Sequence, residues 1–277
     1  MPIPTPVTAS GVDGLTGLLA DPEHAVLAFD YDGVLAPIVA DPDRSPPHPR
    51  AIPTLARLAP MVGSIAIITG RPAAVAVAYG QFEQWPTLTD LVVFGHYGRE
   101  RWDGRSRTVQ APPASAAVDA ARRSLPAVVD AIGMAGVRIE DKGSALAVHT
   151  RRSPDPDAAL TAAHGPLLAF ARAHDLVVEP GRYVLELRPP GTDKGTTLRA
   201  HAEQVAARCV VYTGDDLGDL TAFATIDALR REGVAGLKVC SGSAEVVEVA
   251  RQADLVVDGP DGVVALLDEF VAALESR

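Results

Sequence analysis

The sequence lacks the features that would place the protein in a membrane or outside the cell. No apolar run approaches the roughly 20 residues that a membrane-spanning helix needs. The first ten residues, MPIPTPVTAS, contain no basic region followed by an apolar stretch, as a secretory signal would. These absences predict a cytoplasmic protein without a membrane partner.

Basic charge is also scarce. The chain has 25 basic and 35 acidic residues, a formal net charge of −10, and no basic stripe of the kind that binds nucleic acid. We therefore expect no nucleic-acid partner. The acidic balance also disfavours anionic ligands in general, so a phosphate site would need local cations or a metal ion.

Cysteines and aromatic residues are few. Cys209 and Cys240 each lie at the edge of a short apolar segment, and neither has the partners of a disulfide or a nucleophile, so we expect two reduced, buried thiols. Aromatic residues make up 5% of the chain, against 47% for all apolar types. The core must therefore consist of Ala, Val, Leu and Ile, which is typical of a parallel sheet covered by helices.

The sequence does contain, at both ends, an alternation of β-rich runs and alanine-rich amphipathic helices. In the first part, strands are expected at 25–33, 64–70 and 91–95, with helices at about 49–60 and 72–82. The last part repeats this order, with strands at 209–216, 236–240 and 253–258 and helices at 194–206, 218–230, 244–251 and the C-terminus. Such βαβ units predict a Rossmann-like parallel sheet.

The middle of the chain has a different pattern. Helices are expected at 113–133 and 156–174, and short strands at 137–143, 145–150, 176–181 and 183–189. The strand pairs are joined by KGS and by PG, which predicts hairpins and an antiparallel sheet. The chain is therefore predicted to be α/β, with a core of residues 1–103 and 190–277 and an inserted α+β domain at 104–189.

Four polar clusters follow the expected core strands or open the helix after the inserted domain. They are Asp30 and Asp32; Thr69, Gly70 and Arg71; Lys194; and Asp215, Asp216 and Asp219. Because the carboxyl ends of parallel strands lie along one edge of a sheet, these clusters are expected to converge despite their separation in sequence. The sequence thus predicts one polar site at that edge.

The residue types of this site suit phosphoryl transfer. Carboxylates from two strand ends offer the oxygen ligands that Mg²⁺ prefers. Asp30 and Asp32 are two residues apart and would face the same side of a regular strand, so one can attack phosphorus while the other moves a proton. Taken singly, each aspartate is equally well explained as a helix cap or a turn residue.

The remaining groups can hold phosphate. Thr69, Lys194 and the backbone N–H groups around Gly33 and Gly70 can bind the phosphoryl oxygens. Phosphoryl transfer depends mainly on such positioning and on neutralising charge.

In their order and spacing, DYDG (30–33), TGR (69–71), Lys194 and GDDLGD (214–219) resemble the phosphatases of the haloacid-dehalogenase superfamily. The resemblance covers essentially the whole chain and implies a core of that superfamily with an inserted cap of the C2 type. It also implies that Asp30 is the nucleophile that forms an aspartyl phosphate. Asp32 would be the acid for the leaving oxygen and then the base that activates water.

The same resemblance implies the phosphate and metal ligands. Thr69 and Lys194 would bind the transferred phosphoryl group. Mg²⁺ would be held by Asp30, the backbone carbonyl of Asp32 and Asp215, with Asp216 and Asp219 close by.

Arg71 has two interpretations. It can contact the phosphate end of the substrate, or it can be structural, because Pro72 suits the start of a helix.

Strand periodicity predicts one polar face on the sheet of the inserted domain. Glu140 and Lys142 alternate with apolar residues such as Ile139 along one expected strand. Glu186 alternates with leucines along another strand, and His149 is expected on the same polar face. Carboxylates and a lysine suit a polyhydroxylated ligand. A solvated face with ordinary cross-strand ion pairs is the alternative.

Two segments narrow the choice of substrate. IEDKGSALAVHTR (139–151) and GRYVLELRPPGTDKG (181–195) resemble the corresponding segments of trehalose-6-phosphate phosphatases. The resemblance implies that Glu140, Lys142 and Glu186 contact the sugar of a small-molecule sugar phosphate.

The chain departs from that family at two places. Leu220 stands where the family has Glu after the last aspartate, and Tyr97 separates His96 from Gly98. His96 is therefore either a substrate ligand or a packed loop histidine.

The expected activity is hydrolysis of trehalose 6-phosphate to trehalose and phosphate, in trehalose biosynthesis, by a monomer. Sucrose phosphate, mannosyl-phosphoglycerate or a general hexose phosphate are alternative substrates, and a phosphomutase is an alternative enzyme. A non-catalytic phosphosugar-binding module would be expected to lack Asp30 or Asp32, and both are present. A receiver-type signalling domain needs only about 120 residues and no inserted domain.

Overall fold

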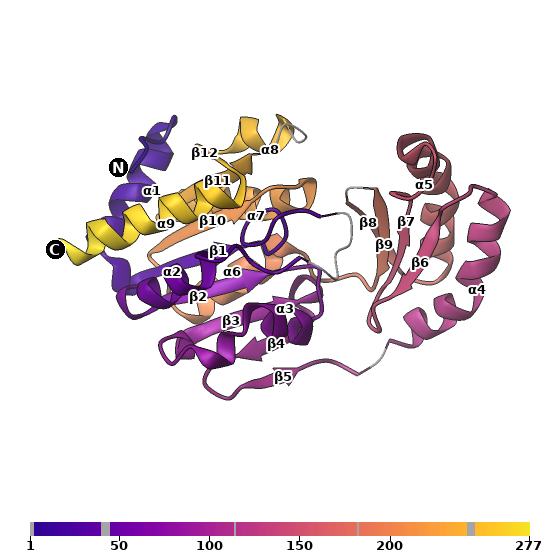
Figure 1. Ribbon diagram of the computed structural model, residues 1–277, viewed down its shortest axis with the longest axis horizontal. Coiled ribbons are helices and arrows are strands. Elements are labelled where there is room, and N and C mark those ends of the chain that lie inside the picture. The colour runs from indigo at the N-terminus through magenta and orange to yellow at the C-terminus, as the bar shows by residue number, and fades with distance from the viewer. Residues whose placement is uncertain (1–2, 40–44, 114, 182, 243–246) are drawn as a thin grey trace. The chain divides into compact units, whose positions relative to one another are not determined.

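The computed structural model describes residues 3–39, 45–113, 115–181, 183–242 and 247–277. The chain forms two compact units (Figure 1). One consists of Met1–Ala111 and Asp193–Arg277, and the other, called the insert below, of Pro112–Thr192.

An eight-stranded sheet runs through the first unit. Its strands lie in the order β12 (Leu255–Asp258), β11 (Ala235–Gly242), β10 (Cys209–Gly214), β1 (Ala25–Phe29), β2 (Ser64–Ile68), β3 (Leu91–Gly95), β4 (Glu100–Asp103) and β5 (Thr108–Gln110). The strands from β12 to β3 are parallel, and β4 and β5 are antiparallel additions at one edge. The parallel part confirms the expected α/β class.

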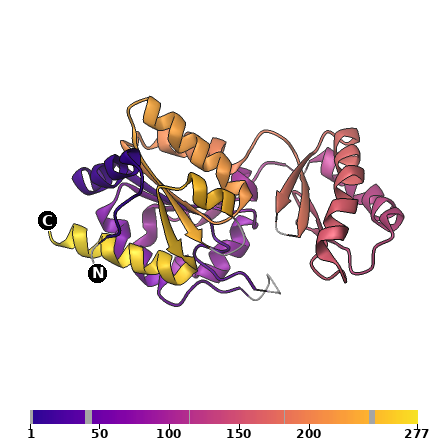
Figure 2. The same ribbon diagram turned by 90° about the horizontal axis from the view of Figure 1, so that it is seen from above.

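Helices cover both faces of this sheet (Figure 2). On one face lie α1 (Ala9–Ala20), α2 (Ala51–Leu58), α3 (Ala73–Gly80) and α9 (Gly259–Glu275). On the other lie α6 (Lys194–Gln204), α7 (Leu220–Arg231) and α8 (Val247–Gln252). The central strands β1, β2 and β10 are thus buried on both faces, which explains their near-continuous apolar sequences. Cys209 and Cys240 are unpaired and buried in this core, as expected.

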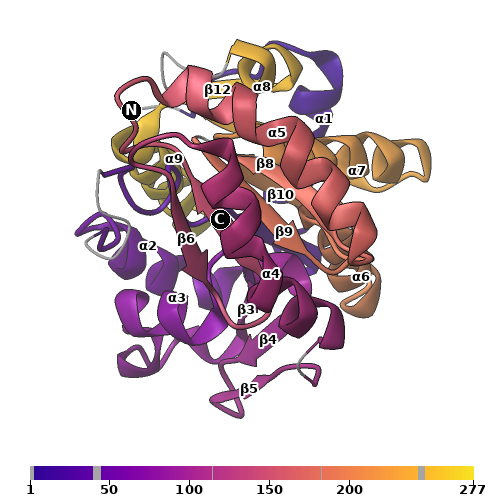
Figure 3. The same cartoon turned by 90° about the vertical axis from the view of Figure 1, so that its right-hand side faces the viewer.

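The insert contains a four-stranded antiparallel sheet with both of its helices on one face (Figure 3). Its strands lie in the order β6 (Arg138–Asp141), β7 (Leu146–His149), β9 (Val184–Arg188) and β8 (Val177–Gly181). α4 (Ala116–Ile132) and α5 (Pro156–Ala173) cover its apolar side. Both expected hairpins, β6–β7 and β8–β9, are present.

Helix α1 is absent from the elements expected from the sequence. Its twelve residues include three glycines, which lower helix propensity. Packing explains them, because a Cβ on Gly14 would lie 1.7 Å from the carbonyl oxygen of Gly236 in β11. Thr8 begins the helix by accepting a hydrogen bond from the N–H of Gly11. Tertiary contact therefore outweighs local propensity here.

The sequence also gave no sign of β4 and β5. Of β4, only Trp102 is buried, and all of β5 is exposed, so neither strand shows an apolar run. Both follow from pairing with the strand beside them.

Near the C-terminus, residues 244–246 of an expected helix lie outside the described residues, and α8 begins at Val247. None of the described helices is both long and apolar enough to cross a membrane.

Candidate active site

The candidate site lies where the order of the parallel strands reverses. From β1 the chain continues to β2 and β3 on one side, whereas β10 is followed by β11 and β12 on the other. β1 and β10 are direct neighbours, and the N–H of Asp30 donates to the carbonyl of Thr213 at 2.9 Å. In open α/β sheets, ligands bind at such a switch point, outside the carboxyl ends of the strands.

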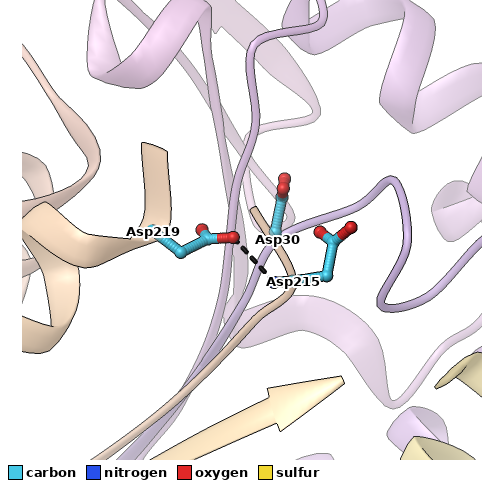
Figure 4. Close-up of side chains that lie close together, drawn as sticks. All are labelled: Asp30, Asp215 and Asp219. Atoms are coloured by element: carbon cyan, nitrogen blue, oxygen red, sulfur yellow. Dashed lines mark hydrogen bonds between the residues drawn. The ribbon is translucent and has the colours of Figure 1, made fainter. Parts of the chain in front are cut away.

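Three carboxylates meet at this point (Figure 4). Asp30 follows β1, and Asp215 and Asp219 follow β10. One oxygen from each lies within 4.8 Å of the others. With Asp216, these residues form what we call the carboxyl cluster. The expected convergence of remote aspartates at one sheet edge is therefore present.

Lys194 is the cation of the carboxyl cluster. It is the first residue of α6, whose start is fixed by a capping box between Asp193 and Thr196. Its Nζ lies 2.7 Å from Asp30 Oδ2 and 2.7 Å from Asp219 Oδ1. Burial alone would lower the pKa of Lys194, but the surrounding carboxylates raise it well above its usual value. The ammonium group therefore stays charged.

Asp219 organises the loop that carries Asp215. Its carboxylate accepts from Lys194, from the hydroxyl of Tyr212 at 2.7 Å, and from the N–H groups of Asp215 and Asp216 at 2.8 and 3.0 Å. Burial opposes ionisation, but Lys194 and these donors together lower the pKa of Asp219 below its usual value. With four donors, Asp219 is better suited to shaping the site than to binding a ligand. The sequence did not reveal Tyr212, because a tyrosine in a buried strand looks like a core residue.

Asp30 and Asp215 lie in surroundings that disfavour the negative charge of their carboxyl groups. Burial raises the pKa of Asp30 well above its ordinary value. Lys194 opposes this rise, and repulsion by Asp219 and Asp216 adds to it. Burial and the charge of Asp30 likewise raise the pKa of Asp215. Four carboxyl groups thus surround one ammonium group, and this surplus of negative oxygen fits a hard divalent cation.

The loop after β1 is shaped to accommodate Asp215. Gly33 has φ +74°, and a Cβ there would lie 2.0 Å from Asp215 Oδ2. Within the described chain, no donor hydrogen-bonds to the Asp215 carboxylate. Gly33 directs its own N–H to the carbonyl of Ala36 at 2.8 Å. The glycine therefore permits the close approach of a carboxylate that has no hydrogen-bond donor among the described residues.

Asp32 lies outside the carboxyl cluster and pairs with Arg71. Arg71 Nε donates to Asp32 Oδ2 at 2.7 Å, and its second nitrogen donates to Oδ1 at 2.6 Å. The Asp32 side chain is 40% exposed, whereas that of Asp30 is 7% exposed. β1 ends at Phe29, so neither Asp30 nor Asp32 lies on the strand, and the two-residue alternation expected of a regular strand does not apply to them.

Thr69, Arg71 and His96 belong to two interlocked loops. Thr69 is buried, and its hydroxyl accepts from the N–H of Arg71 at 3.1 Å. The loop after β3 braces this segment, with the N–H of Tyr97 donating to Thr69 and that of His96 donating to Arg71. The His96 side chain is 2% exposed, with Nε2 at 3.7 Å from Glu100 Oε1. His96 is therefore buried within this loop. A Cβ on Gly70 would meet the hydroxyl of Tyr97.

The insert has one polar sheet face. Strand register aligns Glu140, Ala147, Glu186 and Glu179 in a row across four strands. Lys142 Nζ lies 2.6 Å from Glu186 Oε2, and His149 Nε2 lies 2.7 Å from Glu140 Oε2. Glu186 is 3% exposed, and its Oε1 accepts no hydrogen bond from the described residues.

The opposite face of this sheet is apolar, as expected, although one residue differs. Leu146, Val148, Leu185 and Leu187 are buried under the two helices. Ile139 was expected with them but is 36% exposed, because β6 is an edge strand.

The pair of Arg188 and Glu179 on the polar face was not singled out from the sequence. Arg188 donates to Glu179 Oε2 at 2.5 Å. The two-residue period of LVVEPG (176–181) and YVLELRP (183–189) could have revealed the pair, since it places Glu179 and Arg188 on the same face as Glu186.

Comparison with solved structures shows the fold. The C-terminal domain of a trehalose-6-phosphate phosphatase of C. albicans is similar with a TM-score of 0.77 at 22% identity, covering 98% of this chain and 99% of that one. A haloacid dehalogenase-like hydrolase of Bacteroides thetaiotaomicron is similar with a TM-score of 0.58 at 17% identity, covering 88% and 98%. The fold is that of the haloacid-dehalogenase-type phosphatases with an inserted cap.

Sequence comparison identifies the family within this class. The family described as trehalose-phosphatase matches residues 28–261. A trehalose-phosphate phosphatase of Mycolicibacterium paratuberculosis is 30% identical over 283 aligned residues, covering 99% of this chain and 68% of the relative. The chain belongs to the trehalose-phosphatase family, whose members are phosphatase hydrolases.

Proposed function

We propose that the protein hydrolyses trehalose 6-phosphate to trehalose and inorganic phosphate, with Mg²⁺ as cofactor. The observation that carries this proposal is the buried Asp30 carboxylate, held 2.7 Å from Lys194 beside Asp215 in a chain that matches the trehalose-phosphatase family over most of its length. The choice of substrate is supported by its similarity to trehalose-phosphate phosphatases.

Asp30 is the nucleophile in this proposal. Its Oδ1 accepts the N–H of Tyr31 at 2.6 Å and its Oδ2 accepts Lys194, which orients the carboxylate and supports its negative form. One Asp30 oxygen forms a bond to phosphorus as the bond from phosphorus to the sugar oxygen breaks. The sugar oxygen takes a proton from Asp32 and leaves as the free alcohol.

Water completes the reaction. Asp32, now a carboxylate, takes a proton from a water molecule as that water attacks phosphorus. The bond between phosphorus and Asp30 breaks, which releases phosphate and restores both side chains. The greater exposure of Asp32 supports this division of labour, because the proton-transfer group must reach both the sugar oxygen and water.

Mg²⁺ would be held by Asp30, Asp215 and the backbone carbonyl of Asp32, with Asp216 and Asp219 close by. When bound, it supplies positive charge to the phosphoryl oxygens and offsets the carboxylates. The raised pKa values of Asp30 and Asp215 support this assignment, because burial and the neighbouring carboxylates disfavour their negative charge, which a bound cation would offset. Thr69, Gly70 and Lys194 would hold the phosphoryl group.

Glu140, Lys142 and Glu186 would bind the sugar. They lie on one polar face, and the carboxylates accept hydrogen bonds from hydroxyl groups while the ammonium group donates them. The Oε1 atom of the buried Glu186 supports this, since it has no hydrogen-bond partner among the described residues and buried polar atoms rarely lack one.

A substrate panel tests the assignment. Phosphate release should be measured with Mg²⁺ for trehalose 6-phosphate, sucrose phosphate, mannosyl-phosphoglycerate and glucose 6-phosphate. The proposal predicts the highest kcat/KM for trehalose 6-phosphate. Equal values for the hexose phosphate would defeat the specific assignment, and phosphate transfer to a second hydroxyl would indicate a mutase.

A further inference from the structure

The contact between Arg71 and Asp32 joins two segments that are far apart in sequence. The planar guanidinium group meets the carboxylate at two points, which is the geometry that arginine favours and lysine cannot reproduce. The pair is therefore specific in orientation as well as in charge.

Aromatic rings fix the guanidinium group in place. The Arg71 Cζ atom lies 5.3 Å from the ring centroid of Tyr31 and 5.3 Å from that of Tyr79. The Arg71 side chain is only 10% exposed. Its backbone is held as well, because its N–H donates to the Thr69 hydroxyl and its carbonyl accepts from His96.

Tyr31 connects this arrangement to the proposed nucleophile. It lies between Asp30 and Asp32 in sequence, is fully buried, and donates its N–H to Asp30 Oδ1. The ring that packs against Arg71 thus belongs to the residue whose backbone orients Asp30. A change in Arg71 would be felt first at Asp32, the more exposed of the two carboxyl groups.

We propose that Arg71 is a positioning residue that orients Asp32 for proton transfer, and that it is not a ligand of the phosphate. The inference rests on the proposed phosphatase function and assigns Arg71 a role within it. Each Asp32 oxygen accepts one N–H from Arg71, and a carboxylate oxygen has a second lone pair that can face the substrate. Without Arg71, a partly exposed aspartate would sample several rotamers and lose its alignment.

This role has a signature in the choice of substrate. The sugar oxygen of trehalose 6-phosphate is a poor leaving group and needs the proton of Asp32. The p-nitrophenolate ion leaves without one. A residue that acts through Asp32 should therefore matter for the sugar phosphate and little for p-nitrophenyl phosphate, whereas a phosphate ligand should matter equally for both.

The experiment compares R71A, R71K and the control R101A with the wild type. Arg101 is a suitable control because it also packs over an aromatic ring, that of Phe94, and hydrogen-bonds to Gln204 in the same unit. We expect R71A to lower kcat/KM for trehalose 6-phosphate about 100-fold, the typical contribution of a positioned acid. Its kcat/KM for p-nitrophenyl phosphate and its inhibition constant for inorganic phosphate should change less than about threefold. R101A should match the wild type.

The conservative variant and a mutant cycle provide independent tests. R71K should fail to restore turnover of the sugar phosphate, because one ammonium group cannot hold both oxygens. In a D32N background, R71A should cause little further loss, since residues that act as a unit are not additive. Tyr79→Leu, which removes one ring and keeps the ion pair, should give a smaller loss with the same substrate dependence, and it replaces R71A if that variant does not fold.

Three results would overturn the inference: equal losses on both substrates with weaker phosphate inhibition, full rescue by R71K, or additive losses with D32N. A wild type that hydrolyses p-nitrophenyl phosphate but not trehalose 6-phosphate would instead reject the proposed substrate. The two failures are therefore distinguishable.

Discussion

The carboxyl cluster of the first unit and the polar face of the insert contain the same kind of side chain in opposite electrostatic situations. In the cluster, three carboxyl groups share a single ammonium group, that of Lys194, and a fourth, that of Asp215, lies beside them. On the insert, each glutamate of the row has its own partner: Lys142 for Glu186, His149 for Glu140 and Arg188 for Glu179.

The difference shows what each region needs from outside. A cluster with surplus buried charge needs a cation to be stable in its ionised form. A face on which each of these glutamates already has a hydrogen-bond partner needs none, and its donors and acceptors can exchange partners with the hydroxyl groups of a sugar. The first arrangement suits chemistry on phosphate, and the second suits recognition.

The largest expected effect is that of Asp30→Asn. The amide keeps the shape of the side chain but cannot attack phosphorus, so kcat should fall at least about a thousandfold. Phosphate release and far-ultraviolet circular dichroism should be measured together. Asp227→Asn, which alters a carboxylate paired with Lys238 in the same unit, is the matched control and should stay active. A near-normal rate for Asp30→Asn would exclude Asp30 as the nucleophile.

Lys194→Met should destabilise the protein more than Lys142→Met. It leaves buried carboxylates without their cation, and we expect a loss of about 3–5 kcal/mol in the free energy of unfolding. Lys142→Met removes a lysine with one carboxylate partner and should lower it by about 1–2 kcal/mol. Urea denaturation measures both. Equal losses would remove the contrast between the two regions.

The elements of the sheet could largely be read from the sequence because burial on both faces imposes continuous apolar runs. AVLAF, SIAII and CVVYTG are such runs, and the polar residues after them mark the strand ends at which the site forms. The meeting of the aspartates at one edge of the sheet could be predicted from the parallel order of the strands alone.

The contacts within the site could not be predicted, because tertiary packing decides them. Nothing in the local sequence shows that Arg71 pairs with Asp32, since the rings of Tyr31 and Tyr79 also hold its guanidinium group. The four donors of Asp219 likewise depend on where β10 and α6 lie. Helix α1 and strand β4 form against partners that their own sequences do not reveal.

Magnesium should stabilise the protein through the carboxyl cluster and not through the insert. At about 100 times its Kd, Mg²⁺ should raise the free energy of unfolding by about 3 kcal/mol. Asp215→Asn should abolish this increase, and Glu179→Gln, a matched change of one carboxylate on the insert, should retain it. Thermal unfolding with and without Mg²⁺ measures the difference. Retention of the full increase in Asp215→Asn would show that the ion binds elsewhere.

The smallest expected effect is a loss of specificity in Glu140→Gln. Its kcat/KM for trehalose 6-phosphate should fall about tenfold, since the amide offers one acceptor where the carboxylate offers two. Turnover of p-nitrophenyl phosphate should stay within about threefold of the wild type. Asp141→Asn is the control, because Asp141 is on the same strand but pairs with Arg122. Equal losses on both substrates would mean that the polar face of the insert does not recognise the sugar.

The most direct measurement is an acid quench of the enzyme during turnover of trehalose 6-phosphate labelled with ³²P. The account predicts label on a peptide that contains Asp30, sensitive to hydroxylamine as an acyl phosphate is, and absent from Asp30→Asn. Label on another residue, or rapid turnover with no labelled protein at any quench time, would contradict it.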